Sequence, residues 1–394
     1  MLKECLNTFK TSGILEYSLA AKNSAERIID DIASNPKQKL NKSLYEQYAG
    51  NLRKAINTVY AEDTEDGLSD QFRANVSRFA AYKALHATQQ IKIQLEKSTD
   101  DAKRVINAFN RYQAAEYNTA VARSRTAKQF SEFIEPDNLR LFPNMRWLPS
   151  RSVTLREEHV VFYNRIWPKN DPFWSYNQPG NLWNCKCDWE ETDEPTTDGN
   201  PNAHIRHNGL EGNPAMTGEI FTDNSAYIKN NINIKLDSQS AKAYKNLQTL
   251  LSNDNKWRLD YYTDNEGIMV TNRNRIKESE INKQERAKFS KEHSMCRTLA
   301  VNGHKIEYRE TVQGSFDIFL DGVPAELKKT KAAGNIVNYA KKAINSQKAR
   351  IVVFEFEKMN VKIIEELKRL DELKISHVYF TSKEKNKIFY HKNQ

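Results

Sequence analysis

The sequence predicts a multidomain protein with a mainly helical N-terminal part and a C-terminal α/β domain built on a mixed sheet. Its 394 residues exceed what one hydrophobic core usually organises, so two or three domains are expected. Apolar residues recur at helical spacing in the first 135 residues. In the last 109 residues, strand-length apolar runs alternate with helical segments, which is typical of an α/β domain.

The first 135 residues have two features of helices. No glycine occurs between positions 67 and 180, and no proline between positions 36 and 136, so residues that break helices are missing here. Segments Leu44–Val59 and Phe72–Leu95 carry apolar residues at helical spacing. The second segment is expected to bury a broad stripe, which comprises Phe72, Val76, Phe79, Ala80, Leu85 and Ile91.

From residue 136 onward the composition changes. Prolines recur, and five of the six tryptophans fall between positions 147 and 189. This composition predicts an irregular knob anchored by aromatic side chains rather than a regular sheet. The knob contains the sequence Cys185-Lys186-Cys187, and His159 lies upstream on an expected helix, Leu155–Arg165.

His159, Cys185 and Cys187 are three ligands of the kind that zinc prefers. A closed structural site needs a fourth ligand, and the candidates are Asp171, Asp188, His204 and His207. The alternative to zinc is a pair of buried thiols beside a hydrogen-bonded histidine. The four cysteines of the chain are too scattered for a disulfide framework, so a reducing compartment is expected.

Short motifs in this region follow the order typical of one family. They are Arg151-Ser152, Arg156-Glu157-Glu158-His159, Asp171-Pro172-Phe173-Trp174, Pro179-Gly180, Trp183-Asn184-Cys185-Lys186-Cys187, Asn213-Pro214-Ala215 and Gly218-Glu219-Ile220-Phe221. Residues 50–228 thereby resemble the Mu-F-like minor head proteins, also called head morphogenesis proteins, of tailed phages. The resemblance implies a structural component near the portal vertex of the virion head, with portal and head proteins as partners. The family usually has Cys-Arg-Cys, so Lys186 is a departure.

The region after this module predicts the domain boundaries. Residues 190–240 are rich in Asn, Asp, Thr, Gly and Pro, as in a loop-rich linker. Beyond it, Ala243–Leu251 is expected to be helical, and Trp257–Tyr262 to form a hairpin with Gly267–Thr271. We therefore divide the chain into a head module at 1–228, a linker and accessory segment at 229–285, and a last domain at 286–394.

The excess positive charge of the chain lies entirely in the last domain. Residues 286–394 carry 22 Lys and Arg against 13 Asp and Glu, a net charge of +9, which equals the net charge of the whole chain. A basic domain on a neutral carrier indicates a polyanionic partner for that domain, such as nucleic acid. The alternative is an ordinary lysine-rich surface.

The last domain is expected to have the element order α-β-β-β-α-β-α-β-β. The first helix, Phe289–Asn302, ends at Gly303, and Glu292 falls on its apolar stripe. The later helix Val361–Leu373 is expected to bury Ile364, Leu367 and Leu370. The other expected elements are the strand Lys305–Thr311, a hairpin over 316–328, the helix Gly334–Gln347, and the strands Ile351–Phe356, Ser376–Thr381 and Lys387–His391.

The predicted hairpin carries the candidate catalytic residues. Asp321-Gly322 is a strong signal for a two-residue turn. The register that follows from it pairs Leu320 with Val323, Ile318 with Ala325 and Phe316 with Leu327 on one apolar face. On the other face, Asp317 lies opposite Glu326, with Lys328 two residues further on. Opposed carboxylates destabilise a sheet, so they indicate a divalent cation or, alternatively, an exposed hairpin with screened charges.

This pattern resembles the PD-(D/E)xK nuclease superfamily. Asp317, Glu326 and Lys328 match its motif, Glu292 matches the glutamate of its first helix, and Gln347 the glutamine of a later helix. The usual proline before the aspartate is Phe316 here. The domain also resembles toxin domains of contact-dependent-inhibition proteins and phage polymorphic toxins, several of which cleave transfer RNA.

The resemblance implies hydrolysis of phosphodiester bonds in tRNA or DNA, with Asp317 and Glu326 holding Mg²⁺ or Mn²⁺. Lys328 would position a water or stabilise charge, and Glu292 would bind a second metal or orient Lys328. Flanking phosphates would be held by Lys329, Lys331, Lys341, Lys342, Lys348 and Arg350. A barnase-like RNase without metal is an alternative, in which Glu292, His293, His304 or Lys328 would act in acid–base catalysis.

The leading interpretation is a phage minor head protein that carries a nuclease toxin into a target bacterium, with an acidic immunity protein as a further partner. It would reside in the virion head and act in the bacterial cytoplasm. The alternative is a non-catalytic head protein whose basic domain binds packaged DNA. No membrane partner is expected, because no apolar run approaches membrane-spanning length.

Overall fold

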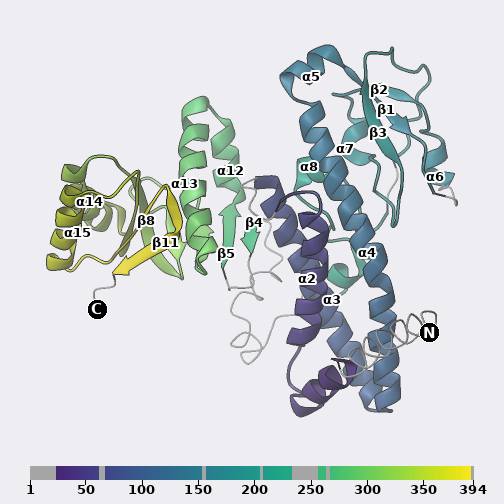
Figure 1. The fold of residues 1–394 in the computed structure, drawn as a ribbon, viewed down its shortest axis with the longest axis horizontal. Coiled ribbons are helices and arrows are strands. Elements are labelled where there is room, and N and C mark those ends of the chain that lie inside the picture. Colours follow the sequence, from purple (N-terminus) through teal and green to yellow (C-terminus); the bar gives the residue numbers. More distant parts are fainter. Residues whose placement is uncertain are drawn as a thin grey trace, which may run out of the picture. The chain divides into compact units, whose positions relative to one another are not determined.

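The structure is a computed structural model that describes residues 24–61, 67–152, 157–204, 207–232, 256–262 and 267–391 (Figure 1). The chain divides into two compact units, Met1–Leu251 and Ser252–Gln394. Helices dominate the first unit and a mixed β-sheet the second, as the sequence predicts. The predicted helix Ala243–Leu251 and the motif residue Arg156 lie outside the described residues.

Among the described residues, no helix has both the length and the apolar character that crossing a lipid bilayer requires.

Three long helices form the frame of the first unit. They are α2 (Lys42–Asn57), α3 (Gly67–Leu95) and α4 (Thr99–Phe133), and they pack against one another (Figure 1). Asn41 and Ser98 cap α2 and α4, since each side chain accepts a hydrogen bond from a backbone N–H of the first turn. All six residues of the predicted apolar stripe on α3 are buried, which confirms that prediction.

The Trp-rich region contains a small regular sheet, which corrects the expectation of an irregular knob. Strand β1 (Asn144–Leu148) pairs antiparallel with both β2 (Ile166–Pro168) and β3 (Asp188–Thr192). Met145 and Trp147 alternate inward on β1, so the aromatic core itself has a strand period. The short helices of this region are α5 (Pro136–Leu141), α6 (Glu157–Val160), α7 (Phe173–Tyr176), α8 (Pro214–Thr217) and α9 (Ala226–Lys229).

The helix predicted at Leu155–Arg165 is also shorter than expected. Its described part has one helical turn, α6, followed by a turn at residues 161–164. Asn164 adopts a left-handed backbone conformation with φ of 60°, which a continuing helix does not allow. His159 nevertheless lies on α6 and is fully buried.

The second unit is built on an eight-stranded sheet with the order β11-β10-β9-β8-β7-β6-β5-β4. Its first strands, β4 (Trp257–Tyr262) and β5 (Ile268–Asn272), form the predicted hairpin and lie within the segment assigned to a linker. Parallel pairing joins β5 to β6, β8 to β9 and β9 to β10, and the other neighbours are antiparallel. The remaining strands are β6 (Lys305–Tyr308), β7 (Ile318–Leu320), β8 (Val323–Lys329), β9 (Ile351–Phe356), β10 (His377–Thr381) and β11 (Glu384–His391).

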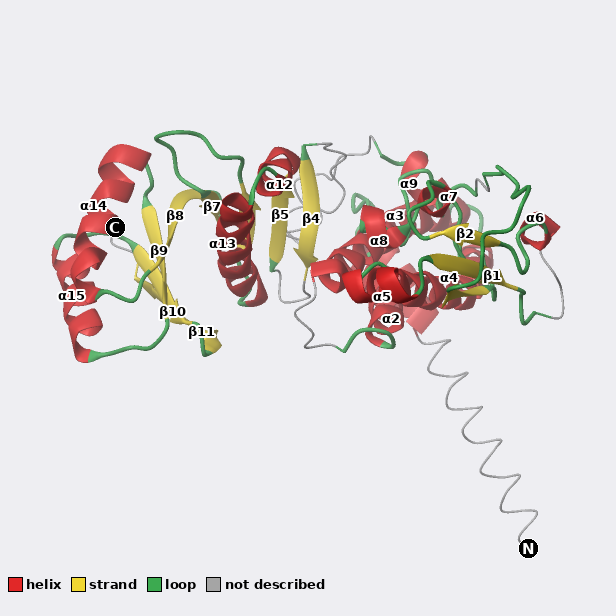
Figure 2. Ribbon diagram, turned by 90° about the horizontal axis from the view of Figure 1, so that it is seen from above, coloured by secondary structure: helices red, strands yellow, loops and turns green. Residues whose placement is uncertain are grey.

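Helices cover both faces of this sheet (Figure 2). Helix α13 (Lys283–Val301) packs on one face through Met295, Cys296 and Leu299. Helices α14 (Ile336–Gln347) and α15 (Val361–Glu372) pack on the other. A further helix, α12 (Arg273–Glu280), precedes α13 and contacts it. Over residues 286–394 the element order is the predicted one.

Two predicted core positions are wrong. Ile364 is 44% exposed, and Ile363 takes its place in the core beside Leu367 and Leu370. Both isoleucines fit a helical period with the later leucines, and packing against the sheet selects the first. Phe316 packs against the cluster under α14 and α15, not on the face of Leu327, because it precedes the regular part of β7.

Candidate functional site

The five candidate catalytic residues line one cavity of about 260 Å³ in the second unit. They come from three different elements and one loop. Glu292 lies on α13, Asp317 immediately precedes β7, Glu326 and Lys328 lie on β8, and Gln347 ends α14. The fold therefore brings together residues that are up to 55 positions apart in the sequence (Glu292 and Gln347).

The tight turn predicted from Asp321-Gly322 positions the hairpin residues. Both turn residues have positive φ, 50° and 82°, as a two-residue type I′ turn requires. The register pairs Leu320 with Val323 and Ile318 with Ala325, which confirms the predicted pairing. Asp321 also fixes the turn, because its carboxylate accepts a hydrogen bond from the backbone N–H of Lys305 at 2.8 Å.

Glu326 is the most buried residue of the group, with 1% of its surface exposed. Its Oε1 accepts hydrogen bonds from Lys328 Nζ at 2.6 Å and from Gln347 Nε2 at 2.5 Å. Its Oε2 is buried and has no hydrogen-bond partner among the residues that the structure describes. A buried carboxylate oxygen without a donor is costly, so Oε2 is a candidate ligand atom for a bound cation.

Asp317 shares the cavity with Glu326. One of its oxygens, Oδ2, accepts the backbone N–H of Leu327 at 3.0 Å, which holds the side chain against β8. Burial, together with the nearby negative charge of Glu326, raises the pKa of Asp317 to about 6. The two carboxylates therefore repel one another across the hairpin, as the predicted register implied.

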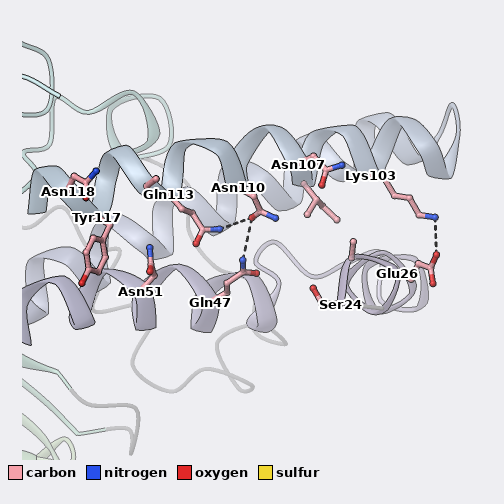
Figure 3. A pocket seen from close by; sticks show the side chains of 13 residues that line it. Ser24, Glu26, Gln47, Asn51, Lys103, Asn107, Asn110, Gln113, Tyr117 and Asn118 are labelled. Atoms are coloured by element: carbon pink, nitrogen blue, oxygen red, sulfur yellow. Dashed lines mark hydrogen bonds and ion pairs between the residues drawn. The ribbon is translucent and has the colours of Figure 1, made fainter. Parts of the chain in front are cut away.

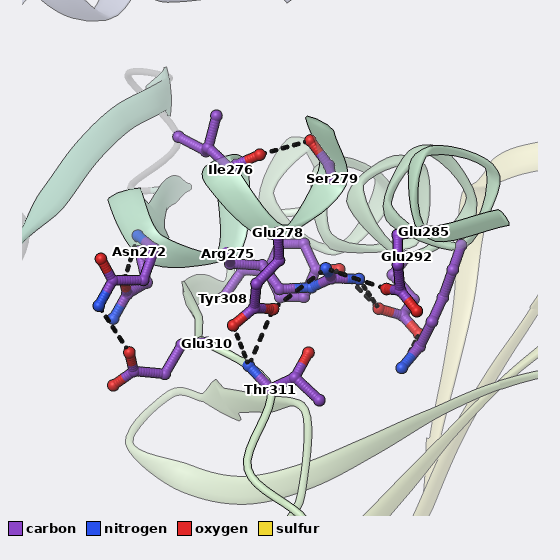
Figure 4. Close-up of polar contacts among 12 residues, drawn as sticks. Asn272, Arg275, Ile276, Glu278, Ser279, Glu285, Glu292, Tyr308, Glu310 and Thr311 are labelled. Atoms are coloured by element: carbon purple, nitrogen blue, oxygen red, sulfur yellow. Dashed lines mark hydrogen bonds and ion pairs between the residues drawn. The ribbon is translucent and has the colours of Figure 1, made fainter. Parts of the chain in front are cut away.

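Glu292 is bound by partners that the sequence did not reveal (Figure 4). Its Oε2 accepts a hydrogen bond from the hydroxyl of Tyr308 at 2.5 Å and one from Arg275 Nη2 at 3.3 Å. Burial and the negative charge of Asp317 raise the pKa of Glu292. The nearest lysine recorded beside Glu292 is Lys288, with 3.9 Å between Nζ and Oε1, and not Lys328.

Arg275 is the main functional candidate that sequence reasoning missed. It lies on α12, is 1% exposed, and also contacts Glu278 at 3.3 Å and Glu285 at 3.7 Å (Figure 4). Its Nε donates to the hydroxyl of Tyr308 at 3.0 Å. In the sequence, Arg275 stands in a highly charged segment and resembles a solvated residue. In the structure, β4 and β5 join the sheet, and α12 follows them directly. This arrangement places Arg275 in the lining of the cavity.

A second hollow, of about 370 Å³, adjoins the first and shares Lys288 and Glu292 with it. Lys288, Lys291 and Lys329 line this hollow together with Glu285 and Glu292, so its cations outnumber its carboxylates by one. Of the predicted phosphate-binding residues, only Lys329 belongs to it, and its Nζ also contacts Glu355 at 2.8 Å. Lys331 pairs with Glu357, and the remaining four, Lys341, Lys342, Lys348 and Arg350, are exposed outside both hollows.

The acidic cavity has the donor set that a hard divalent cation needs. Mg²⁺ and Mn²⁺ prefer carboxylate oxygens, and they bind through one or two carboxylates plus water and phosphate oxygens. Asp317 and Glu326 both line the cavity and offer such oxygens, among them Glu326 Oε2. The residues therefore fit the predicted cation.

In the first unit, His159, Cys185 and Cys187 gather as predicted. All three are buried, and His159 Nδ1 lies 3.4 Å from Cys185 Sγ and 3.3 Å from Cys187 Sγ. Tetrahedral zinc with these ligands needs separations of about 3.6 Å, so the group nearly has the required spacing. The other ring nitrogen, Nε2, donates to Asn181 Oδ1 at 2.8 Å, which leaves Nδ1 with its lone pair toward the thiols.

The surroundings of the two thiols favour ionisation of Cys185 over that of Cys187. Hydrogen bonding from Cys187 lowers the pKa of Cys185, whereas the same contact and burial raise the pKa of Cys187. In the part of the chain that the structure describes, no fourth His, Cys, Asp or Glu joins the three within 4.8 Å. Asp171 accepts from the backbone of Phe173, and Asp188 pairs with Arg125. His204 stacks on Tyr176, and His207 lies against Trp183, so none of the four candidates completes the site.

A further hollow of about 1030 Å³ lies along α2 and α4 in the first unit (Figure 3). Amides dominate its lining, among them Gln47, Asn51, Asn107 and Asn110. Its two charged residues, Lys103 and Glu26, pair with one another at 3.0 Å. It holds no paired carboxylates, so it has no chemistry comparable with that of the smaller cavity.

No family model, no curated protein and no solved structure matches the chain.

Proposed function

We propose that the second unit is a metal-dependent phosphodiesterase that cleaves tRNA or DNA. The observation that carries this proposal is the pairing of Asp317 with the buried Glu326, whose Oε2 has no donor among the described residues, beside the ammonium of Lys328. Two converging carboxylates and a lysine in a cavity are what metal-assisted hydrolysis of a phosphodiester needs. A surface that only binds DNA has no use for opposed carboxylates.

In this proposal, Asp317 and Glu326 hold the cation, and Gln347 and Lys328 orient Glu326 through its Oε1. A cation held there would supply positive charge next to the scissile phosphate and would lower the pKa of a bound water. Lys328 is half-buried, and its Nζ lies 2.6 Å from Glu326 Oε1, so its charge is fixed at the edge of the cation site. There it positions the attacking water and stabilises the charge that develops on the phosphate.

Glu292 acts as a positioning residue rather than as a ligand of the first cation. Its Oε2 is occupied by Tyr308 and Arg275, whereas its Oε1 faces Lys288 at 3.9 Å. Glu292 therefore orients Lys288 at the junction of the acidic and basic hollows. Lys288, Lys291 and Lys329 bind the phosphates that flank the scissile bond, in line with the net positive charge of residues 286–394.

For the first unit we propose the role of a minor head protein that carries the nuclease in a phage virion. Its support is the motif order in residues 151–221 and the burial of His159, Cys185 and Cys187 at one point. The three residues would hold zinc, with water or a residue outside the described chain as fourth ligand. Portal and head proteins, and an acidic immunity protein for the nuclease, are the partners of this proposal.

The direct experiment is digestion of plasmid DNA and total tRNA by the full chain, with Mg²⁺, with Mn²⁺ and with chelator. We expect cleavage only with a cation, and none by Glu326→Ala. Glu307→Ala is the matched control, because Glu307 lies on β6 of the same sheet and outside the cavity. If the full chain is inactive on both substrates with either cation, the proposal is wrong.

A metal-independent RNase is a second candidate, because the raised pKa of Asp317, about 6, suits acid–base catalysis. The two chemistries leave different ends. Attack by the ribose 2′-hydroxyl yields a cyclic phosphate and requires RNA, whereas attack by water leaves no cyclic phosphate and also operates on DNA. Analysis of product ends, with and without chelator, separates the two.

A further inference from the structure

A second cluster of ligand-type residues lies in the second unit, outside the acidic cavity. It consists of Asp371 in the last turn of α15, His377 at the start of β10 and His391 at the end of β11. One ligand atom from each lies within 4.8 Å of the other two. None of the three lines the acidic cavity or the basic hollow beside it.

His377 is fully buried, and its orientation is fixed by the backbone. Its Nδ1 donates a hydrogen bond to the carbonyl of Ile375 at 2.9 Å, since a carbonyl can only accept. The neutral ring therefore carries its lone pair on Nε2. Within the described ranges of the chain, no group forms a hydrogen bond with Nε2, although the atom is buried.

The other two residues of the cluster lie close to this nitrogen. Asp371 Oδ1 lies 3.9 Å from His377 Nε2 and 3.7 Å from His391 Nδ1. The two imidazoles are cross-strand partners and stack with centroids 4.9 Å apart and planes 7° from parallel. Asp371 and His391 have about 43% and 44% of their side chains exposed, so the cluster opens to solvent on their side.

We propose that Asp371, His377 and His391 bind a divalent transition-metal ion of the zinc class. Two imidazole nitrogens and one carboxylate oxygen are the ligands that Zn²⁺, Ni²⁺ or Cu²⁺ prefers over Mg²⁺. A hydrogen bond from the second ring nitrogen to a backbone carbonyl is the usual support of a metal-bound histidine, and His377 has it.

The distances need only a small change, but the ring of His391 must also turn out of its stack on His377, because two rings 7° from parallel do not direct both in-plane lone pairs at one ion. Ligand atoms around a tetrahedral ion at 2.0–2.1 Å are about 3.3 Å apart. The present separations of 3.7 and 3.9 Å therefore close by about 0.5 Å, which rotation of the exposed Asp371 and His391 side chains allows. Water completes the coordination on the open side. The bound ion ties the last strand, β11, to the end of α15.

The test uses the full chain and Co²⁺, with equilibrium dialysis and absorption spectra. We expect His391→Ala and Asp371→Asn each to lose one tightly bound Co²⁺ per chain and the corresponding visible bands. Glu372→Gln, which changes the exposed carboxylate next to Asp371, should keep the bound Co²⁺ and its visible bands. The near-ultraviolet band of cobalt bound to thiolate should persist in all three variants if the Cys185–Cys187 cluster also binds cobalt, so loss at one site is distinguishable from loss at the other.

Thermal unfolding provides a second readout. Excess Zn²⁺ should raise the melting temperature of the second unit's transition in the wild type, and by less in His391→Ala, because an ion that binds only the folded state stabilises it. His391 is half-exposed at the end of its strand, so the variant is expected to fold. Equal metal content in wild type, His391→Ala and Asp371→Asn would overturn the proposal.

Discussion

The side-chain amide of Gln347 donates a hydrogen bond to Oε1 of Glu326 at 2.5 Å, across 21 positions of sequence. Lys328 donates to the same oxygen, whereas Oε2 has no hydrogen-bond partner among the described residues. The last residue of α14 therefore sets the orientation of the carboxylate on β8. A residue that orients a metal ligand in this way is expected to affect metal affinity more than stability.

The first prediction follows from this contact. Gln347→Ala should raise the Mg²⁺ concentration for half-maximal cleavage by about 10- to 100-fold, the usual effect of losing a support of a metal ligand. The measurement is initial rate against Mg²⁺ concentration. Asn345→Ala, an exposed change on the same helix, is the control and should leave the curve in place. An unchanged metal dependence in Gln347→Ala would show that the contact does not serve a metal site.

The raised pKa of Asp317 predicts that its replacement increases the stability of the fold and abolishes nuclease activity. Its pKa of about 6 in the folded protein lies above its ordinary value of 3.8, so the fold binds the proton more tightly than the unfolded chain does. Ionised Asp317 therefore destabilises the fold, and this cost appears as pH rises from 3.8 through 6. Asp317→Asn should raise stability by about 2–3 kcal/mol at pH 7.5, and this gain should disappear near pH 4.

Urea unfolding of wild type and Asp317→Asn at pH 4, 5.5 and 7.5, without added metal, tests this. The same variant should have no nuclease activity. If Asp317→Asn is less stable than the wild type at pH 7.5, favourable contacts of the carboxylate outweigh its burial and its repulsion by Glu326.

The buried Arg275 predicts a large effect on stability. Arg275→Ala leaves the partly buried Glu292 without the guanidinium of the buried Arg275, and breaking a buried ion pair typically costs about 3–5 kcal/mol. Arg273→Ala, an exposed change two residues earlier on α12, should cost less than about 0.5 kcal/mol. Chemical denaturation of the second unit's transition within the full chain measures both. If both variants lose a similarly small part of the free energy of unfolding, the contacts of Arg275 with Glu292 do not contribute as predicted.

The basic hollow predicts where nucleic acid binds. Each lysine that contacts a phosphate contributes a slope of about 0.7–0.9 to the dependence of log affinity on log salt concentration. Lys288→Ala with Lys291→Ala should therefore weaken binding of catalytically inactive Glu326→Gln protein and reduce that slope by about 1.4–1.8. Lys362→Ala with Lys368→Ala, two exposed changes on α15, should leave the slope unchanged. Fluorescence anisotropy across a salt series provides the comparison.

Sequence patterns predict much of the second unit because its turns, strands and helices are determined by residues close together in the sequence. The turn residues Asp321 and Gly322 set the register, and that register alone predicts Asp317 beside Glu326. The contribution of α12 could not be predicted, because Arg275 reaches the site only after β4 and β5 pair with the rest of the sheet. Such pairings depend on contacts far apart in sequence, which local periodicity does not report.

In the first unit, composition was a poorer guide. The density of tryptophan and proline predicted an irregular knob, yet β1, β2 and β3 form a sheet on which Met145 and Trp147 alternate inward. The residue types of the zinc candidates did predict their proximity, because Cys185 and Cys187 are adjacent on one loop. The fourth ligand could not be found, since its choice depends on tertiary packing rather than on spacing.

The most direct test of the nuclease proposal is single-turnover cleavage of end-labelled tRNA and duplex DNA by the full chain. Wild type, Glu326→Gln and the control Glu307→Gln are compared with Mn²⁺ and with chelator. We predict cation-dependent cleavage without cyclic phosphate ends in wild type and Glu307→Gln, and a rate at least about 10³-fold lower in Glu326→Gln. Equal rates in wild type and Glu326→Gln, or cleavage that persists with chelator, would contradict it.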